Sequence, residues 1–459
     1  MERTFHITTF GCQMNEHDSE IMAGMLTEKG YQEAASRDDA DIVIFNTCSV
    51  RENADKRFFG TLGQLKHRKE DDPGLIVCVC GCMTEQQAVI DQLKEKYPWV
   101  DLIFGTHNIH RLPVLLDRVM AERESIIEVP EDSAEIVEGL PAKRLHHSKA
   151  LVNIMFGCNN FCTYCIVPYT RGREKSRRPE DILRELRGLA EDGVREIMLL
   201  GQNVNSYRGI TKDPDIAERC GVEVDFSKLI RLAAEIDGIE RIRFMTSHPK
   251  DLSDDLIETY RTCGKLCRNI HLPVQSGSSR ILRRMNRKYT REQYLDLVRR
   301  LKDAVPDITI STDIIVGFPG ETEEDFQQTL DLVEEVRYDS AFTFLYSIRK
   351  GTPAERFSDQ IPEDVKHERF NRLVDSIDRI SLEKNLLYEG KTEEVLVEGP
   401  SKRDPGALSG RTDGFKLVNF PIPDGMEQEE AEHKLTGRFV RVRITRAKTF
   451  SLEGELVSY

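Results

Sequence analysis

The sequence of 459 residues lacks the features of a membrane or secreted protein. It contains no stretch of about 20 consecutive apolar residues, so no membrane-spanning helix is expected. Its first residues, MERTFHITTFGC, lack the basic and apolar regions of a signal peptide. The eleven cysteines are odd in number and thinly spread, unlike a disulfide framework. These absences predict a cytoplasmic protein with no membrane partner, whose cysteines stay reduced and can bind metal.

The chain also lacks an excess of positive charge. Its 65 Lys and Arg are outnumbered by 79 Asp and Glu, which gives a net charge of −14 and no global attraction to nucleic acid. Any contact with RNA would have to come from local basic patches. With 39% hydrophobic and 31% charged residues, the composition is typical of a globular protein. The length exceeds that of one ordinary hydrophobic core, so we expect several domains.

Three closely spaced cysteines follow a predicted strand near the middle of the chain. Residues 151–156 are typical of a buried strand that ends at Gly157, and Cys158, Cys162 and Cys165 come next. A structural zinc site uses four ligands, and a cubane 4Fe–4S cluster normally has a cysteine on each of its four irons. Three thiols would leave one iron open for a substrate or cofactor, unless a distant fourth ligand arrives. A zinc knuckle is the alternative.

Residues 1–121 alternate between predicted strands and helices. Apolar runs separated by amphipathic helices indicate an open parallel α/β sheet that is covered on both faces. Cys12, Cys48 and Cys82 each follow one of its strands. Because open parallel sheets bind ligands at the carboxyl ends of their strands, these thiols can converge into a second three-cysteine site. Cys78 and Cys80 fall inside a strand and are expected to be core thiols. The alternative is that all of these cysteines are small core residues.

Residues 145–378 contain six strand-and-helix units and follow a polar, acidic segment, 122–144, that we expect to be a linker. Six units are fewer than the eight of a closed barrel, so we predict a partial (β/α)6 barrel with its site at the carboxyl ends of the strands. Polar side chains that can hydrogen-bond a cofactor lie at or near these ends, although each could instead serve turn formation. They are Gln202, Asn203, Ser247, Gln275 and Asp313. Two basic runs, 171–178 and 280–291, flank this rim and favour phosphate contacts.

Residues 379–459 change to short predicted strands and turns. Val440, Val442 and Ile444 alternate with Arg441 and Arg443, which is typical of a strand with one buried and one basic face. The stretch 433–450 carries six Lys or Arg and no acidic residue. We predict a small antiparallel β-barrel that binds RNA through this basic face. An ordinary solvated strand face is the alternative.

These motifs together resemble a known family. The spacing of Cys158, Cys162 and Cys165, with Tyr164 before the last cysteine, resembles the radical S-adenosylmethionine (SAM) superfamily, whose core fold is a partial (β/α)6 barrel. The stretches GCQMN, NTCSVRENAD and GCM, at residues 11–15, 46–55 and 81–83, resemble the N-terminal domain of the methylthiotransferases. The C-terminal barrel is similar to the TRAM domain of tRNA-modifying enzymes. The resemblance to the methylthiotransferase family covers nearly the whole chain.

The resemblance implies the cofactors and partners. One 4Fe–4S cluster would be held by Cys158, Cys162 and Cys165 and would bind SAM, with the polar rim residues contacting SAM. A second, auxiliary cluster would be held by Cys12, Cys48 and Cys82. The substrate would be a tRNA anticodon stem-loop, and a reductant protein and a sulfur donor would be needed. We expect the protein to be a monomer.

Two branches of this family modify tRNA. NTCSVREN and GQNVNSY resemble the branch that adds a methylthio group to carbon 2 of the isopentenylated adenosine next to the anticodon. The branch that acts on threonylcarbamoyladenosine is the main competitor. From another class, a non-catalytic RNA-binding metalloprotein with structural cysteine sites is the alternative. Cys220, Cys263 and Cys267 show no informative spacing, and we expect structural thiols there.

Overall fold

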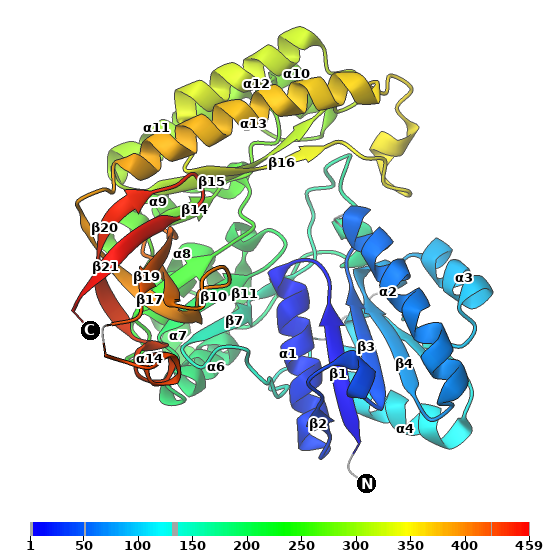
Figure 1. Ribbon diagram of the computed structural model, residues 1–459. Helices are drawn as coiled ribbons and strands as arrows, with labels where there is room; N and C mark the ends of the chain where they lie inside the picture. Colours follow the sequence, from blue (N-terminus) through cyan, green and yellow to red (C-terminus); the bar gives the residue numbers. More distant parts are fainter. Residues whose placement is uncertain (1–2, 50–51, 131–135, 424, 459) are drawn as a thin grey trace.

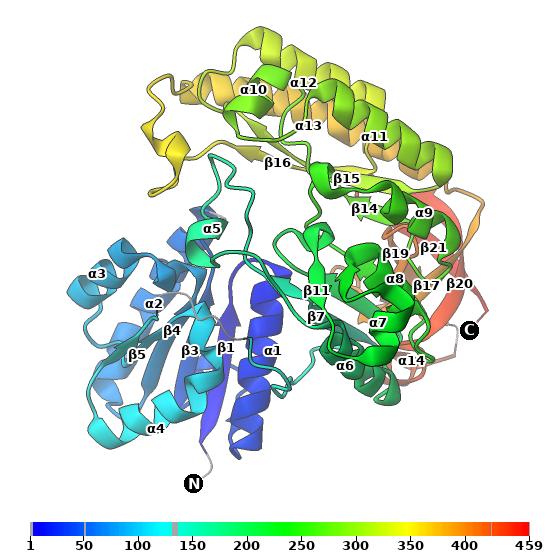
Figure 2. The same cartoon turned by 180° about the vertical axis from the view of Figure 1, so that it is seen from behind.

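The computed structural model describes residues 3–49, 52–130, 136–423 and 425–458, which form three domains (Figure 1). The central domain lies between the other two. The N-terminal domain packs on one side of it and the C-terminal barrel on the other, as the reverse view also shows (Figure 2). Among the described helices, none combines the length and the apolar character that crossing a membrane requires.

The N-terminal domain is a parallel sheet of six strands in the order β2-β1-β3-β4-β5-β6. Its strands β3 and β4 are wholly buried, because α1 and α4 cover one face and α2 and α3 the other. Cys78 and Cys80 lie within β4 and are buried, as predicted. The strands are β1 (Thr4–Thr9), β2 (Gln32–Glu33), β3 (Ile42–Thr47), β4 (Ile76–Gly81), β5 (Leu102–Phe104) and β6 (Ile126–Glu128), and the helices are α1 (Gln13–Glu28), α2 (Glu52–Asp71), α3 (Gln87–Lys96) and α4 (Leu112–Glu122), with 3-10 turns η1 (Arg37–Asp39), η2 (Cys82–Glu85) and η3 (Thr106–Arg111).

One strand of this sheet lies in the segment 122–144, where we expected a linker. Strand β6 pairs with β5 through Leu102 and Ile126, so the sheet continues to residue 128. Further on, the amide of Lys143 donates to the carbonyl of Glu20 on α1, and the amide of Leu145 donates to the Glu20 carboxylate. Part of this segment is therefore held against the N-terminal domain.

The central domain contains the six predicted parallel strands in two sheets of three, ordered β7-β10-β13 and β14-β15-β16, which confirms the partial barrel. Helices cover its outer face (Figure 1). The barrel strands are β7 (Lys149–Asn153), β10 (Glu196–Leu200), β13 (Arg241–Phe244), β14 (Asn269–His271), β15 (Thr309–Val316) and β16 (Ser340–Leu345). The helices are α5 (Val167–Thr170), α6 (Pro179–Glu191), α7 (Pro214–Cys220), α8 (Phe226–Ala234), α9 (Asp254–Thr262), α10 (Ser279–Arg284), α11 (Arg291–Ala304), α12 (Glu323–Val336) and α13 (Glu363–Leu386). Short strands β8 (Met155–Phe156), β9 (Lys175–Ser176), β11 (Arg208–Ile210) and β12 (Glu223–Asp225) and turns η4 (Val204–Ser206), η5 (Pro249–Asp251) and η6 (Pro353–Arg356) complete it.

The C-terminal domain is a closed barrel of five strands in the order β17-β18-β19-β21-β20. The expectation of a purely antiparallel barrel was wrong, since β19 and β21 pair in parallel. The reason is geometric: strands that alternate in direction can close into a ring only if their number is even. Helix α14 carries the chain between β19 and β20, which leaves room for β21 between them. The elements are β17 (Thr392–Pro400), β18 (Ala407–Thr412), β19 (Leu417–Pro421), α14 (Gln428–Leu435), β20 (Phe439–Ala447) and β21 (Leu452–Ser458).

The turn between β18 and β19, residues 413–416, fixes this barrel to the amino ends of the central strands. Arg243 is fully buried and donates hydrogen bonds of 2.7 Å to the carbonyls of Thr412 and Asp413. The same guanidinium pairs with Glu196 at 3.0 Å. Thr309, at the start of β15, donates to the carbonyl of Gly414. The turn therefore depends on a buried charge that must remain paired.

Replacing Arg243 with Met should destabilise the protein by about 3–5 kcal/mol, because Glu196 loses a buried partner and two carbonyls of the turn lose their donor. Chemical unfolding followed by circular dichroism would measure the loss. Arg441→Met, on the exposed face of β20, is the matched control and should change stability by less than about 0.5 kcal/mol. Equal effects of the two substitutions would contradict a structural role for Arg243.

Candidate active site

The three N-terminal cysteines lie together at the carboxyl ends of β1, β3 and β4. Cys12 is the N-cap of α1 and is exposed, whereas Cys48 and Cys82 are buried. Gly11 has a φ of +114°, and a Cβ built on it would lie 2.7 Å from the sulfur of Cys48, so only glycine fits there. The close approach of the chain at Gly11 brings Cys12 and Cys48 side by side. Val50 and Arg51 of the NTCSVREN motif lie outside the described residues.

Cys82 is electrostatically coupled to both other cysteines of this set. Burial raises the pKa of its thiol to about 11; Arg171 opposes this rise, and Cys12 and Cys48 add to it. The thiol is therefore protonated at neutral pH in the absence of a metal, and metal binding must release its proton. We call Cys12, Cys48 and Cys82 the N-terminal cysteine set.

Arg171 connects this set to the central domain. It follows α5, in the loop beyond the central cysteines, and its Nε donates to the Cys82 sulfur at 3.1 Å. Its Nη2 donates to Asn15 Oδ1 at 2.8 Å and forms an ion pair of 2.7 Å with Asp18. Asn15 and Asp18 lie on α1 and are buried, as is Arg171. One buried side chain of the central domain thus contacts both a cysteine and the helix behind it.

The central cysteine set is Cys158, Cys162 and Cys165. Burial raises the pKa of the Cys158 thiol to about 11 and that of Cys165 to about 12, and the neighbouring Cys162 adds to both shifts. Arg287, buried on the loop after α10, donates to the Cys162 sulfur at 3.5 Å. Each cysteine set therefore has one buried arginine within hydrogen-bond distance of one of its sulfurs.

The spacing of the thiols bears on the kind of metal site. Across the described residues, no three Cys, His, Asp or Glu side chains are close enough together to hold a single metal ion. Zinc needs its ligand sulfurs about 2.3 Å from one point, and it needs four ligands in a structural site. In an iron–sulfur cluster each thiolate binds a different iron, so the sulfurs lie further apart. Each set offers three cysteines, one fewer than a structural zinc site uses, and three cysteines leave one iron of a four-iron cluster open.

Two of the predicted rim residues present unpaired oxygens. Gln202 and Asn203 follow β10, and their side-chain oxygens are buried without a hydrogen-bond partner among the described residues. The amide group of Asn203 donates to Asp251 at 2.8 Å, and that of Gln202 faces the sulfur of Met14 on α1. Buried polar atoms are nearly always paired, so these two oxygens suit the hydroxyl or amino groups of a polar cofactor.

The other three predicted rim residues differ in how far their polar groups are already used in contacts within the protein. The Ser247 hydroxyl donates to the carbonyl of His271, so it is already used. Gln275 is buried with a φ of +71°, and its backbone bonds to Asp313 and Ile315 in the neighbouring strand. The Asp313 carboxylate lies 3.4 Å from His271 Nε2 and stays partly exposed. Ser247, Gln275 and Asp313 are thus connected through His271 and the backbone of β15, and the Ser247 hydroxyl is used in a structural contact.

Sequence reasoning missed three side chains of this region. Asn15 and Asp18 lie on α1 just after Cys12, and polar residues spaced three apart on a buried helix face were an available signal. His248 is buried against Tyr289, and burial together with Arg287 and Lys250 lowers its pKa, so its imidazole is neutral. Its place directly after Ser247, among the polar residues that follow β13, was the available signal.

The two basic runs are mostly engaged in structural contacts rather than free for phosphate. Arg280 and Arg284 pair with Asp325 and Asp359, and Arg291 pairs with Glu335. Arg283 and Lys288 remain exposed. The expected phosphate contacts of the run 280–291 are therefore limited to its exposed members.

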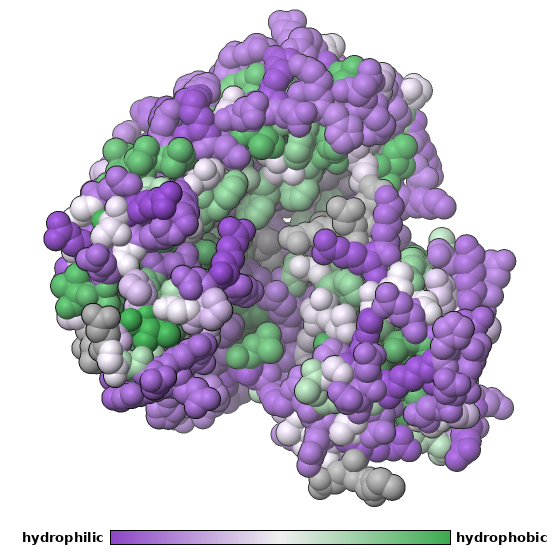
Figure 3. Space-filling view, in the orientation of Figure 1, coloured by the Kyte–Doolittle hydropathy of each residue, from purple (hydrophilic) through white to green (hydrophobic). Residues whose placement is uncertain are grey.

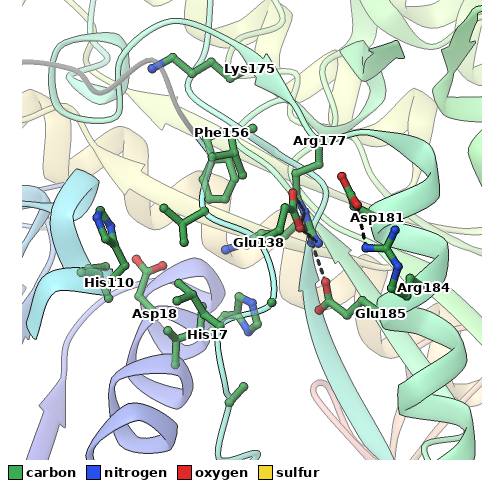
Figure 4. A pocket seen from close by; sticks show the side chains of 18 of the residues that line it. His17, Asp18, His110, Glu138, Phe156, Lys175, Arg177, Asp181, Arg184 and Glu185 are labelled. Atoms are coloured by element: carbon green, nitrogen blue, oxygen red, sulfur yellow. Dashed lines mark hydrogen bonds and ion pairs between the residues drawn. The ribbon is translucent and has the colours of Figure 1, made fainter. Parts of the chain in front are cut away.

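A cavity of about 420 Å³ lies behind Arg171, between α1, the segment around Glu138 and α6 (Figure 4). Its charged side chains pair with one another: Arg177 contacts Glu138 and Glu185, and Arg184 contacts Asp181. The cavity carries neither cysteine set on its wall. It is a gap at the domain interface and not the site of chemistry.

Three family models match the chain in the order of its domains. Residues 4–105 match the uncharacterized protein family UPF0004, residues 152–333 match the radical SAM superfamily, and residues 386–457 match the TRAM domain. The last match confirms the predicted nature of the C-terminal barrel.

Several curated proteins match over nearly their full length. The tRNA-2-methylthio-N(6)-dimethylallyladenosine synthase of Clostridium perfringens (strain 13) is 54% identical over 457 residues, which cover 99% of this chain and 98% of that protein. The proteins of the same name from Clostridium botulinum (strain Alaska E43) and Alkaliphilus oremlandii are each 55% identical, over 99% of this chain and 95% and 93% of their own lengths.

Solved structures agree on the fold. The radical SAM methyltransferase TsrM from Kitasatospora setae superposes with a TM-score of 0.54 at 13% identity, over 77% of this chain and 75% of that one. The cobalamin-dependent SAM radical enzyme OxsB gives a TM-score of 0.51 at 15% identity, over 82% and 56%. Fold, site and family models define a radical SAM protein that carries a TRAM domain. At 54–55% identity over the full length, the chain belongs to the tRNA-2-methylthio-N(6)-dimethylallyladenosine synthase family.

Replacing Arg171 with Gln should destabilise the metal-free protein by about 3–5 kcal/mol, because Asp18 is left buried without its partner. The double variant Arg171→Gln/Asp18→Asn should recover most of that loss, since no unpaired charge remains. Chemical unfolding of the apo-protein would measure both. Arg379→Gln, which breaks an exposed pair with Glu334, should cost less than about 1 kcal/mol. A double variant no more stable than the single one would contradict the assigned pairing.

Proposed function

We propose that this chain adds a methylthio group to carbon 2 of the isopentenylated adenosine next to the anticodon of tRNA. The observation that carries the proposal is the pairing of two three-cysteine sets at facing strand ends, joined by Arg171. A single structural metal site would need neither two sets nor their alignment. The names of the full-length relatives support the prenylated adenosine over threonylcarbamoyladenosine as the substrate.

The central cysteine set is suited to the first cofactor. Cys158, Cys162 and Cys165 would hold a 4Fe–4S cluster with one iron open, and the unpaired oxygens of Gln202 and Asn203 would orient bound SAM. When reduced, this cluster with SAM supplies the radical chemistry that an inert purine C–H bond requires. Arg287 lies at one edge of this set, where it donates to the Cys162 sulfur.

The N-terminal cysteine set is suited to a second cluster. Cys12, Cys48 and Cys82 would hold it, and Cys12 is the exposed member of the set. Arg171 fixes the set relative to the barrel and donates to the Cys82 sulfur. The resulting division of roles is cofactor activation at the central set and sulfur delivery at the N-terminal set.

The remaining partners follow from this chemistry. Cluster reduction needs an electron-donor protein, and repeated turnover needs a sulfur donor. The unpaired base of an anticodon stem-loop can be splayed into a pocket, and the basic face of β20 would bind stem phosphates. We also propose that one copy of the chain suffices, because both cysteine sets lie on the same chain.

Replacing Cys82 with Ala should abolish methylthiolation and leave SAM cleavage intact, because only the N-terminal set is changed. Reconstituted protein would be incubated without oxygen with reductant, SAM and tRNA carrying isopentenyladenosine. Mass spectrometry would measure methylthio-isopentenyladenosine after digestion, and 5′-deoxyadenosine would report SAM cleavage.

Cys162→Ala is the matched control and should abolish both products. Loss of SAM cleavage in Cys82→Ala, with an intact central cluster, would contradict the division of roles. Wild-type protein could instead cleave SAM, leave isopentenyladenosine unchanged and modify threonylcarbamoyladenosine. That result would assign the chain the substrate of the competing branch.

Replacing Arg441 and Arg443 with Gln should weaken tRNA binding. Both side chains are exposed, opposite the buried Val440, Val442 and Ile444, as the alternation predicted. If both contact phosphate, the slope of log affinity against log salt should fall by about 1 for each lost contact. Fluorescence anisotropy across a salt series would measure it. Arg299→Gln, on an exposed pair with Asp296, should leave the slope unchanged.

A further inference from the structure

We propose that Phe342 and Phe344 on β16 form the binding subsite for the adenine ring and its apolar N6 substituent. The inference rests on the proposed function and deepens it, because it assigns residues that select the prenylated base. It starts from the direction of the side chains on the last strand of the partial barrel.

Phe342 and Phe344 face the inside of the barrel. In the register of the parallel strands, Phe342 lies opposite Asp313 and Phe344 opposite Ile315. The alternate residues of β15, Ile314 and Val316, are buried in the core beneath the outer helices. Directly opposed residues of neighbouring strands share a face, so both phenylalanines share the inner face with Asp313.

These rings are unusually exposed for their position. Phe342 is 52% exposed and Phe344 is 38% exposed, although both lie on a strand of the barrel. Figure 3 shows apolar surface on the wall above the hollow between this part of the molecule and the N-terminal domain. Neighbouring exposed apolar side chains in a concave wall mark a binding site rather than ordinary surface.

The aromatic pair is continuous with the central cysteine set. Ile315, opposite Phe344, packs against the cluster around Phe318 and Tyr346. Tyr164, adjacent to Cys165 in the chain, packs against the same cluster, with its ring 6.5 Å from that of Phe318. A base lying on Phe344 would therefore sit next to the wall that carries the central set.

The opposite wall of the barrel leads to the N-terminal set. Met198 and Leu200 on β10 form one apolar cluster with Met14, which lies two residues after Cys12. Phe415, from the turn of the C-terminal barrel, joins this cluster. The inner space is thus apolar on both sides and reaches toward both cysteine sets, where one base carbon has to be approached from two directions.

The charge of this face identifies the occupant. The carboxylate of Asp313, which lies opposite Phe342 in the strand register, pairs with His271. The ring of His271 lies 5.9 Å from that of Phe342. A carboxylate on the N6 substituent, as in threonylcarbamoyladenosine, would be repelled by Asp313 and desolvated by the aromatic rings. An uncharged prenyl chain meets neither cost, and a purine ring stacks on an aromatic face without needing sequence readout.

The test compares the affinities for two anticodon stem-loop RNAs that differ only in carrying adenosine or isopentenyladenosine at the target position. Wild-type protein should bind the prenylated RNA more tightly. Phe342→Ala/Phe344→Ala should weaken binding of that RNA about tenfold and bring the ratio of the two affinities close to one. Phe344→Leu should retain part of the preference, because it keeps apolar surface and removes stacking. Leu387→Ala, 66% exposed just after α13, is the control and should keep the wild-type ratio.

The outcomes separate this inference from the proposed function. The subsite would be overturned by a double variant that folds normally by circular dichroism and keeps the wild-type ratio of the two affinities. It would also be overturned if wild-type protein made the methylthio product without preferring the prenylated RNA. Wild-type protein that makes no methylthio product from prenylated tRNA would overturn the proposed function instead. An equal loss of affinity for both RNAs would assign the phenylalanines to general stacking and would also overturn the selective role.

Discussion

The ion pair of Arg171 with Asp18 is the constraint on which the arrangement of the site depends. Both side chains are buried, and they come from different domains. A buried charge is tolerated only with a partner in good geometry, so the two domains cannot separate or slide without leaving both charges unpaired. The same guanidinium contacts Cys82. Domain docking and the surroundings of one cysteine set are therefore a single structural feature.

The same physical rule operates at the other end of the barrel. Arg243 is buried between Glu196 and the carbonyls of the 413–416 turn, which holds the C-terminal barrel at the amino ends of the strands. The central domain is thus fixed from both ends. The carboxyl ends of its strands face the N-terminal domain. Phe415, from the C-terminal barrel, packs against the apolar cluster of Met14, Met198 and Leu200. The inner space is bounded by all three domains, although family models divide the chain among them.

Features set by residues close together in the sequence could be predicted, whereas contacts between residues far apart in the sequence could not. Cys12, Cys48 and Cys82 could be placed because each lies within three residues of a strand end, and the alternation around Val442 marked a half-buried strand. The Arg171–Asp18 contact joins residues far apart in the sequence, and nothing local distinguishes Arg171 from Arg173. The parallel β19–β21 pair was missed because closure of an odd number of strands is a property of the whole ring. Ser247 was a reasonable candidate for a ligand contact, but its hydroxyl donates to the backbone carbonyl of His271.

Rigid docking by buried pairs suits the proposed reaction, in which two separate sites act on one atom. Misplacing reacting groups by about 1 Å can cost a factor of a hundred in rate, so a flexible tether between the N-terminal and central domains would be a poor solution. Buried ion pairs add little net stability, because desolvation offsets their attraction. Their attraction depends strongly on geometry, however, and it falls when the two charged groups are displaced from each other. The structure accordingly places its buried charged pairs at the domain junctions, next to the apolar cluster of Met14, Met198 and Leu200.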